Sequence, residues 1–198
     1  MLGDEKNENL VDLEAIDLGK TAVLVIDELG DPTAMPPETG VLAAVENTAR
    51  ILDAARAKGV PVVFADDAHI PGLDRELDLW GPHGLAGTPE AQPCPQLGLC
   101  DKDYVVEKRR YSAFFQTGLR LLLDELGVDT LICTGMDTNI CVQHTVADAY
   151  FNNFKIVLVE DATATFLVGT QAGGMDYMRK CYAAEVVKAA DVVARIEG

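Results

Sequence analysis

Six short apolar runs constrain the fold of this chain more than any other feature of its sequence. They lie at 21–27, 61–67, 104–107, 130–135, 155–161 and 191–196. Within them apolar and polar residues do not alternate, which is typical of strands buried on both faces of a parallel sheet. Segments with helical periodicity separate them, at 41–59, 113–127, 139–153 and about 171–190. This order predicts an α/β fold: a three-layer α/β/α sandwich around a mostly parallel six-stranded sheet.

The length and composition of the chain suit one domain. It has 198 residues, of which 48% are hydrophobic, enough for a sizeable core. We therefore expect 1–198 to form a single domain, with 1–20 as a polar lead-in. The first ten residues lack the basic and apolar regions of a signal peptide, and no apolar run approaches the ~20 residues that span a bilayer. These features predict a cytoplasmic protein without a membrane partner.

The charge of the chain narrows the choice of partner. Its 32 acidic and 16 basic residues give a formal net charge of −16. Nucleic acid is bound mainly through Lys and Arg, so it is a poor candidate partner.

The sequence has no G-x-G-x-x-G and no Walker A motif, so we expect no nucleotide cofactor. Its five cysteines are an odd number in a chain expected to be intracellular, so a disulfide framework is not predicted.

Reactive side chains follow several of the predicted strands. Asp27 ends the first run, and Asp66, Asp67 and His69 close or follow the second. Lys108 follows the third run, and Cys141 opens the helical pattern after the fourth. Because open α/β sheets bind ligands outside the carboxyl ends of their strands, these side chains are candidates for one site.

Cys141 has a position that suits a nucleophile. If its helix starts near Asn139, the thiol faces unpaired N–H groups at the positive end of the helix dipole. Lys108 would favour the thiolate further, and Asp27 could accept the proton. The backbone N–H groups of Asp137 and Cys141 could hold an oxyanion. Taken singly, these residues also fit structural roles: a loop cap, a surface charge and a packed core thiol.

Three segments resemble the isochorismatase-like cysteine hydrolases, a family that includes nicotinamidase and N-carbamoylsarcosine amidase. They are V-L-V-I-D at 23–27, K-R-R-Y-S-A-F-F-Q-T-G-L at 108–119 and T-G-M-D-T-N-I-C-V-Q-H-T-V-A-D-A at 134–149, and the resemblance covers about 20–196. It implies a catalytic triad of Asp27, Lys108 and Cys141. It also implies a cis peptide bond between Met136 and Asp137, which would turn the two oxyanion N–H groups inward.

Two further segments resemble the D-x-H and W-x-x-H segments of nicotinamidases: A-D-D-A-H-I-P-G at 65–72 and L-W-G-P-H-G-L-A-G-T-P-E at 79–90. The resemblance implies a divalent metal, zinc or a similar ion, held by Asp67, His69 and His83. Nicotinamidases usually have a third His between these segments, where this chain offers only Asp74 or Glu76. Trp80 and Tyr111 are candidates for the wall of the substrate pocket.

These features predict a cysteine-dependent amidohydrolase of a small non-peptide amide, acting through a thioester on Cys141, with nicotinamide as the leading substrate. Ureido or carbamoyl compounds, maleamate-type acids and amide-bearing antibiotics are alternatives within the family. A non-catalytic binding protein and a redox role for Cys141 are alternatives outside it. Because family members often form dimers and tetramers, we expect a homodimer or homotetramer, and the apolar segment 166–175 could join an interface.

The chain departs from the family at two places near the predicted site. After the first strand it reads D-E-L-G-D-P where the family commonly reads D-M-Q-N-D-F. Position 137 is commonly small in the family, and here it is an acid. If the Asp137 side chain pointed inward, it would place negative charge beside the oxyanion; if it pointed outward, only its N–H would act. Both departures bear on the substrate more than on the chemistry.

Overall fold

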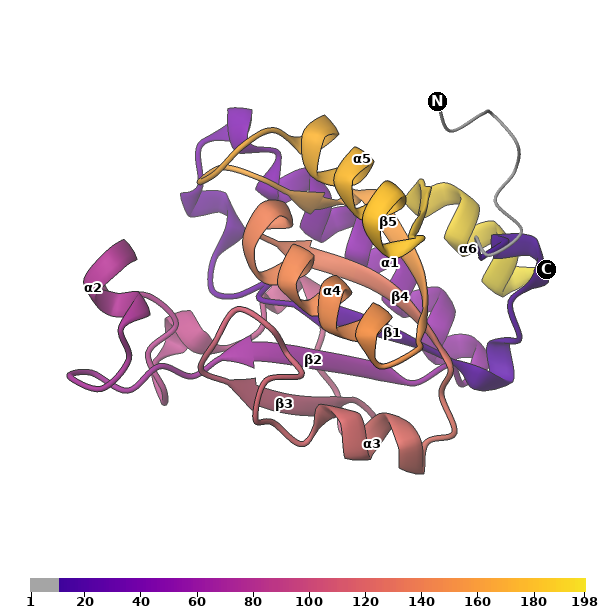
Figure 1. Cartoon of the computed structure of the whole chain (residues 1–198), viewed down its shortest axis with the longest axis horizontal. Helices are drawn as coiled ribbons and strands as arrows, with labels where there is room; N and C mark the ends of the chain where they lie inside the picture. The colour runs from indigo at the N-terminus through magenta and orange to yellow at the C-terminus, as the bar shows by residue number, and fades with distance from the viewer. Residues whose placement is uncertain (1–10) are drawn as a thin grey trace.

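The computed structural model describes residues 11–198, and these contain one sheet of six parallel strands (Figure 1). The strands are β1 Thr21–Ile26, β2 Val62–Asp67, β3 Tyr104–Lys108, β4 Thr130–Met136, β5 Lys155–Ala164 and β6 Glu185–Val187. Their order across the sheet is β3-β2-β1-β4-β5-β6. After β1 the chain adds β2 and β3 on one side of it. It then crosses back to place β4 on the other side of β1, and adds β5 and β6 beyond β4. Ligands of such sheets bind where this direction switches, between β1 and β4.

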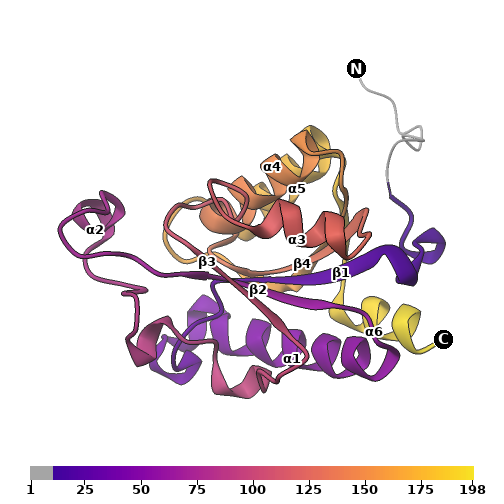
Figure 2. The same ribbon diagram turned by 90° about the horizontal axis from the view of Figure 1, so that it is seen from below.

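Helices cover both faces of the sheet, as predicted (Figure 2). On one face lie α1 Val41–Lys58 and α6 Ala189–Glu197, and on the other α3 Leu119–Glu125, α4 Gln143–Phe151 and α5 Gln171–Tyr182. The short α2 Glu76–Trp80 lies apart from the sheet, within the long connection from β2 to β3 (Figure 1). Among the described residues, no helix combines the length and the apolar character needed to traverse a bilayer.

Strand β1 explains why the apolar runs do not alternate. All six of its residues are buried. Val23 and Val25 belong to the core beneath α1, whereas Leu24 and Ile26 belong to the core beneath α3 and α4. Since successive side chains of a strand point to opposite faces, a strand with helices on both sides must be apolar at every position.

The predicted lead-in is only partly tested, because residues 1–10 lie outside the described part of the chain. Residues 11–20 form two 3-10 turns, Leu13–Ala15 and Leu18–Lys20. Leu13 and Ile16 are buried, and their carbonyl oxygens accept hydrogen bonds of 3.2 and 2.6 Å from Arg195 of α6. This half of the lead-in therefore packs as part of the core.

Three of the predicted elements are wrong in type or extent. Residues 191–196 form α6 instead of the last strand, because Ala189, Val192 and Ile196 place buried side chains on one helical face. The sixth strand is β6, which lies within the range expected to be helical. The helix predicted over 113–127 is shortened to α3, because residues 113–118 form a turn in which Thr117 Oγ1 donates to the carbonyl of Ala113 at 2.5 Å.

Two acids are buried on the α1 side of the sheet. Glu28 is 1% exposed, and its Oε1 accepts a hydrogen bond of 2.7 Å from Thr48 of α1. Asp66 is 3% exposed. Burial raises the pKa of Glu28 to about 8 and that of Asp66 to about 8. An acid whose pKa is higher in the folded than in the unfolded chain keeps its proton in the core while the unfolded chain loses it. The free energy of unfolding therefore falls as the pH rises from about 4 toward 8.

We expect Glu28→Gln to unfold at a higher temperature than the wild type at pH 9, by several degrees, and to differ little from it at pH 5. The amide can still accept from Thr48, but it never has to ionise inside the core. Thermal unfolding measured from pH 5 to pH 9 tests this, with the exposed Glu14→Gln as a control for the loss of one acid. A melting-temperature difference that does not grow with pH would contradict it.

Candidate active site

Four reactive side chains converge at the carboxyl ends of four neighbouring strands, β3, β2, β1 and β4. Asp27 follows β1, Asp67 ends β2, Lys108 ends β3, and Cys141 lies in the π-helical turn Thr138–Val142 after β4. The parallel register brings these ends together, since Ile26 pairs with Ala65 and Asp67 pairs with Lys108. The structure thus brings the three predicted triad residues into one cluster; their catalytic roles remain a prediction.

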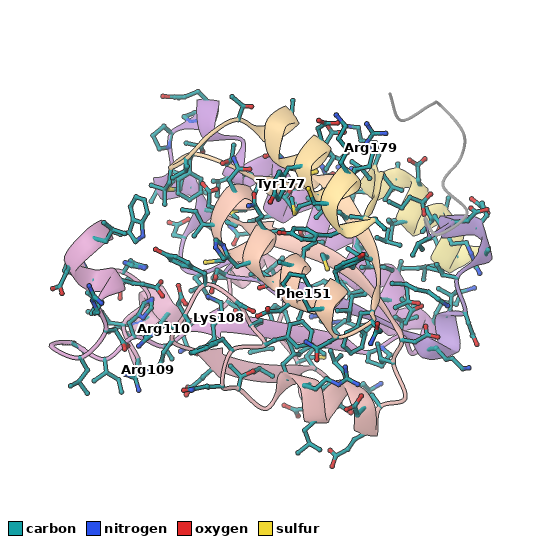
Figure 3. The ribbon with its side chains drawn as sticks, in the orientation of Figure 1. Lys108, Arg109, Arg110, Phe151, Tyr177 and Arg179 are labelled. Carbon is teal, nitrogen blue, oxygen red and sulfur yellow. The ribbon has the colours of Figure 1, made fainter. Side chains whose placement is uncertain are left out.

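The ammonium of Lys108 lies at the centre of this cluster. Its Nζ is 2.7 Å from Oδ2 of Asp27, 2.6 Å from Oδ1 of Asp67 and 3.7 Å from Sγ of Cys141. Lys108 is 1% exposed. Burial alone would lower the pKa of Lys108, but the neighbouring carboxylates outweigh it and the pKa is raised well above its usual value. Figure 3 shows Lys108 nearer the sheet than Arg109 and Arg110, which lie toward α2.

Asp27 has the properties of a general base. Its backbone has a φ of 51°, a left-handed conformation that is uncommon for a residue with a side chain. Its Oδ1 accepts the N–H of Asp67 at 2.8 Å, which fixes the carboxylate. Burial, with the charge of Asp67, raises the pKa of Asp27 to about 7. A carboxylate that titrates near neutrality can both accept and return a proton.

Cys141 is buried, and this changes the expectation drawn from its helix position. Burial and the charge of Asp27 raise the pKa of the thiol well above its ordinary value, and Lys108 only partly offsets them. The resting side chain is therefore a protonated thiol that needs a base. Asp27 can serve, because its carboxylate oxygen lies within 4.8 Å of the sulfur.

The hydrogen bonds of Asp137 show that its acidic side chain points outward and does not place its charge beside the proposed oxyanion. Its carboxylate accepts hydrogen bonds from four groups, at 2.7–2.9 Å: the N–H groups of Asn139, Phe166 and Leu167 and the hydroxyl of Thr165. It therefore ties the segment after β5 to the turn that carries Cys141. The N–H of Asp137 has no hydrogen-bond acceptor among the residues described.

The predicted cis bond between Met136 and Asp137 is wrong, because no peptide bond in the described chain is cis. Gly135, the residue before Met136, instead has a φ of 131°. A Cβ at Gly135 would collide with the carbonyl of Ile26 at the end of β1. Glycine thus lets β4 approach β1 and redirects the chain into the Cys141 turn without a cis peptide.

A cavity of about 480 Å³ opens above Asp27 and Cys141. The two predicted pocket residues both line it, and Trp80 Nε1 donates to the hydroxyl of Tyr111 at 2.9 Å. Its apolar walls also include Leu29, Met136, Ile140, Phe166 and Leu167. A cavity of this size suits a small ligand.

The predicted metal ligands lie together beside this cavity. Ligand atoms of Asp67, His69 and His83 are all within 4.8 Å of one another. Nδ1 of His83 is 2.8 Å from the carbonyl of Gly81, which leaves Nε2 free to bind an ion. A Cβ at Gly84 would lie 2.7 Å from Cβ of Asp67, so only glycine lets the loop after His83 pack against β2.

Glu76 and Asp74, the two acids that might replace a third His, have different surroundings. Oε2 of Glu76 is 3.7 Å from Nε2 of His69, and both atoms are buried without a hydrogen-bond partner. Asp74 lies 3.4 Å from the other nitrogen, Nδ1, and is held by Arg109 at 2.6 Å. These two buried polar atoms without hydrogen-bond partners are suited to bind a divalent ion together with Asp67 and His83. Asp74 lies beside Nδ1, the other ring nitrogen of His69, and would orient the ring.

Some lining residues were not identified from the sequence as part of the site. Leu29 stands where the family commonly has Gln, and Phe166 and Leu167 lie in the segment considered for an interface. Glu90 lies on the long connection between β2 and β3. Side chains from such connections carry no periodic signal, so only tertiary structure places them. The remaining histidine, His144, contacts the carbonyl of Ile140 and the ring of Tyr111, outside the candidate ligand group.

Comparison with known proteins places this arrangement in a family of hydrolases. Residues 21–191 match the Isochorismatase domain, so the chain belongs to the isochorismatase family. Nicotinamidase 3 of Arabidopsis thaliana is 32% identical over 73% of this chain and 73% of its own length.

Solved structures show the same similarity. N-carbamoylsarcosine amidase from Thermoplasma acidophilum has a TM-score of 0.79 and 33% identity, covering 86% of this chain and 96% of that one. Nicotinamidase PncA from Bacillus subtilis has a TM-score of 0.76 and 28% identity, covering 85% and 99%.

We expect Asp137→Ala to lower the free energy of unfolding by about 1–3 kcal/mol, because it leaves the N–H groups of Phe166 and Leu167 without their acceptor. Chemical denaturation measures this loss. Asp137→Asn, which keeps one acceptor oxygen, should lose less. Asp176→Ala removes an exposed carboxylate and is the control. The expectation fails if Asp137→Ala is as stable as Asp176→Ala.

Proposed function

We propose that the protein hydrolyses the carbon–nitrogen bond of a small non-peptide amide through a thioester on Cys141. One observation carries the proposal: the buried ammonium of Lys108 contacts both Asp27 and Cys141, and these two line a cavity large enough for such an amide. A binding protein has no need to bury an acid, a base and a thiol together, since burying charged groups is costly.

The first half of the reaction forms the thioester. Asp27 takes the proton of the Cys141 thiol, and the sulfur attacks the carbonyl carbon of the amide. The carbonyl electrons move to its oxygen, which the N–H groups of Asp137 and Cys141 would stabilise. The carbon–nitrogen bond then breaks, and the leaving nitrogen takes the proton from Asp27. Ammonia or an amine departs.

The second half returns the enzyme to its starting state. Asp27 takes a proton from water, and the oxygen attacks the thioester carbon. The carbon–sulfur bond breaks, the carboxylic acid leaves, and the sulfur regains its proton from Asp27. In both halves Lys108 faces the groups that carry negative charge, the Asp27 carboxylate and the Cys141 sulfur.

A divalent metal is part of the proposal as a binding element. Asp67, His69, His83 and Glu76 would hold it, and the bound ion would supply an electron-pair acceptor for a ring nitrogen of the substrate. Asp67 also contacts Lys108, so it links this group to the cluster around Cys141. Such an ion would orient the substrate, whereas the proton transfers belong to Asp27.

Nicotinamide is the leading substrate of the proposal. Relatives and structural neighbours of this chain are named nicotinamidase. The cavity offers apolar and aromatic walls for a planar ring, and Asp27 and Cys141 lie where its amide would react. We also expect a homodimer or homotetramer, as the resemblance to the family implies.

Ammonia release from small amides, nicotinamide first, tests the proposed reaction. We expect Cys141→Ala to lose at least about 10³-fold in kcat, because no nucleophile remains. Cys133→Ala removes a thiol buried in β4, so it is the matched control and should keep most of the activity. Release that is equally fast in Cys141→Ala and wild type would sink the thioester mechanism.

Zinc binding tests the proposed metal ligands without any need for activity. We expect His83→Ala to weaken binding of zinc by roughly tenfold or more in calorimetry, because one of four ligands is lost. His144→Ala removes a histidine from outside the ligand group and should bind zinc like the wild type. Equal affinities in all three proteins would contradict the assignment of His83.

A further inference from the structure

The cavity above Cys141 is lined by acids. Five acidic residues are among those that line it: Asp27, Asp67, Glu76, Glu90 and Asp137, of which Asp137 turns its carboxylate toward the N–H groups of Phe166 and Leu167. Over residues 11–198, no lysine or arginine is among the lining residues. Lys108 contacts Asp27 and Asp67 but does not itself line the cavity. Lys108 offsets part of the charge of Asp27 and Asp67, and Glu76 and Glu90 add further acids, so the space offered to a ligand carries an excess of acidic groups.

Two arginines beside α2, Arg109 and Arg110, are held by a different carboxylate, although the charge of Arg110 also acts on Glu76. Arg109 and Arg110 both bind the buried carboxylate of Asp74, at 2.6 and 3.1 Å. They line a different hollow, together with Phe115 and Gln116. A carboxylate on a substrate is normally held by an arginine or lysine, or by several hydrogen-bond donors. The described cavity offers it no cation.

Glu90 is an exposed acid at the rim of the cavity. It lies in the turn Pro89–Ala91, and its side chain has no hydrogen bond or ion pair with any described residue. The backbone beside it is held firmly, because Gly30 N donates to the carbonyl of Gln92 at 2.9 Å and Cys94 N donates to that of Glu28 at 2.8 Å. The turn is thus attached to the segment that follows Asp27.

From this charge distribution we propose that the site binds small amides that carry a positively charged group more tightly than neutral ones such as nicotinamide, and rejects amides that carry a carboxylate, with Glu90 at the cavity rim as the residue that recognises the cation. The inference rests on the proposed function and names its substrate class. A divalent ion would not alter the selection, because Asp67 and Glu76 would neutralise it and leave Glu90 unpaired. The aromatic walls at Trp80 and Tyr111 also suit an organic cation.

Binding of three matched ligands to the full-length Cys141→Ala protein tests this without requiring turnover. The ligands are benzamide and its meta-substituted forms with an aminomethyl or a carboxylate group, which differ chiefly in charge. Calorimetry at low salt should give the tightest binding for the cation and the weakest for the anion, with roughly tenfold between neighbours in the series. The order should persist after metal is removed by a chelator, and it should weaken at high salt.

Glu90→Gln in the same background isolates the proposed residue. It should reduce the affinity ratio of the cation to benzamide severalfold. Glu197→Gln, at the end of α6 and on the opposite side of the molecule from α2 (Figure 1), makes the same change in net charge and should keep the ratio. An anion that binds as tightly as the cation, an unchanged ratio in Glu90→Gln, or no binding by any ligand would each overturn the inference.

The outcome separates this inference from the proposed function. Hydrolysis of benzamide by the protein with Cys141 intact reports on the function alone. Charge-ordered binding without any hydrolysis would support the selection and contradict the amidase. Hydrolysis of benzamide, with binding affinities that do not follow the charge of the ligand, would support the amidase and contradict the selection.

Discussion

The buried ammonium of Lys108 is the interaction on which the rest of the site depends. It lies at the end of an edge strand and reaches under the ends of β2 and β1 to contact Asp67 and Asp27. Removing one partner of a buried ion pair typically costs about 3–5 kcal/mol, because the remaining charges lose their compensation. The same contact that joins three strand ends therefore also opposes the rise that burial causes in the pKa of Asp27, and it places a positive charge beside Cys141.

Two buried acids on opposite faces of the sheet differ in their protonation. Asp66 and Asp67 are neighbours on β2 and point to opposite faces, because strand side chains alternate. Asp67 meets Lys108, which lowers the pKa of Asp67 against the effect of its burial. Asp66 has no such partner, and burial raises its pKa to about 8. One acid is thus kept ionised at the site, while the other stays protonated in the layer beneath.

Sequence reasoning predicted the parts of this structure that depend on local pattern. Strands β1 to β5, the helix Val41–Lys58 and the clustering of Asp27, Lys108 and Cys141 follow from apolar runs and from the rule that ligands gather at strand ends. The sequence resemblance also led to the grouping of Asp67, His69 and His83. The edge strand β6 was missed, because three residues give too short a pattern beside an amphipathic helix.

What the sequence left open depends on tertiary contacts. The direction of the Asp137 side chain is decided by N–H groups almost thirty residues away in the chain, on Phe166 and Leu167. The raised pKa of Cys141 follows from burial, which its place in a helical turn does not reveal. Glu90 reaches the cavity only because its turn is fastened to the segment after β1.

Capture of the acyl group by hydroxylamine tests the central claim, a thioester on Cys141, most directly. Hydroxylamine attacks thioesters readily, so turnover of an amide in its presence should yield the corresponding hydroxamate as well as the acid. We predict that, in the wild type, the fraction of product recovered as hydroxamate rises with hydroxylamine concentration. The rate of ammonia release should still be set by the rate at which the thioester forms. Steady ammonia release with no hydroxamate at any hydroxylamine concentration would contradict the account.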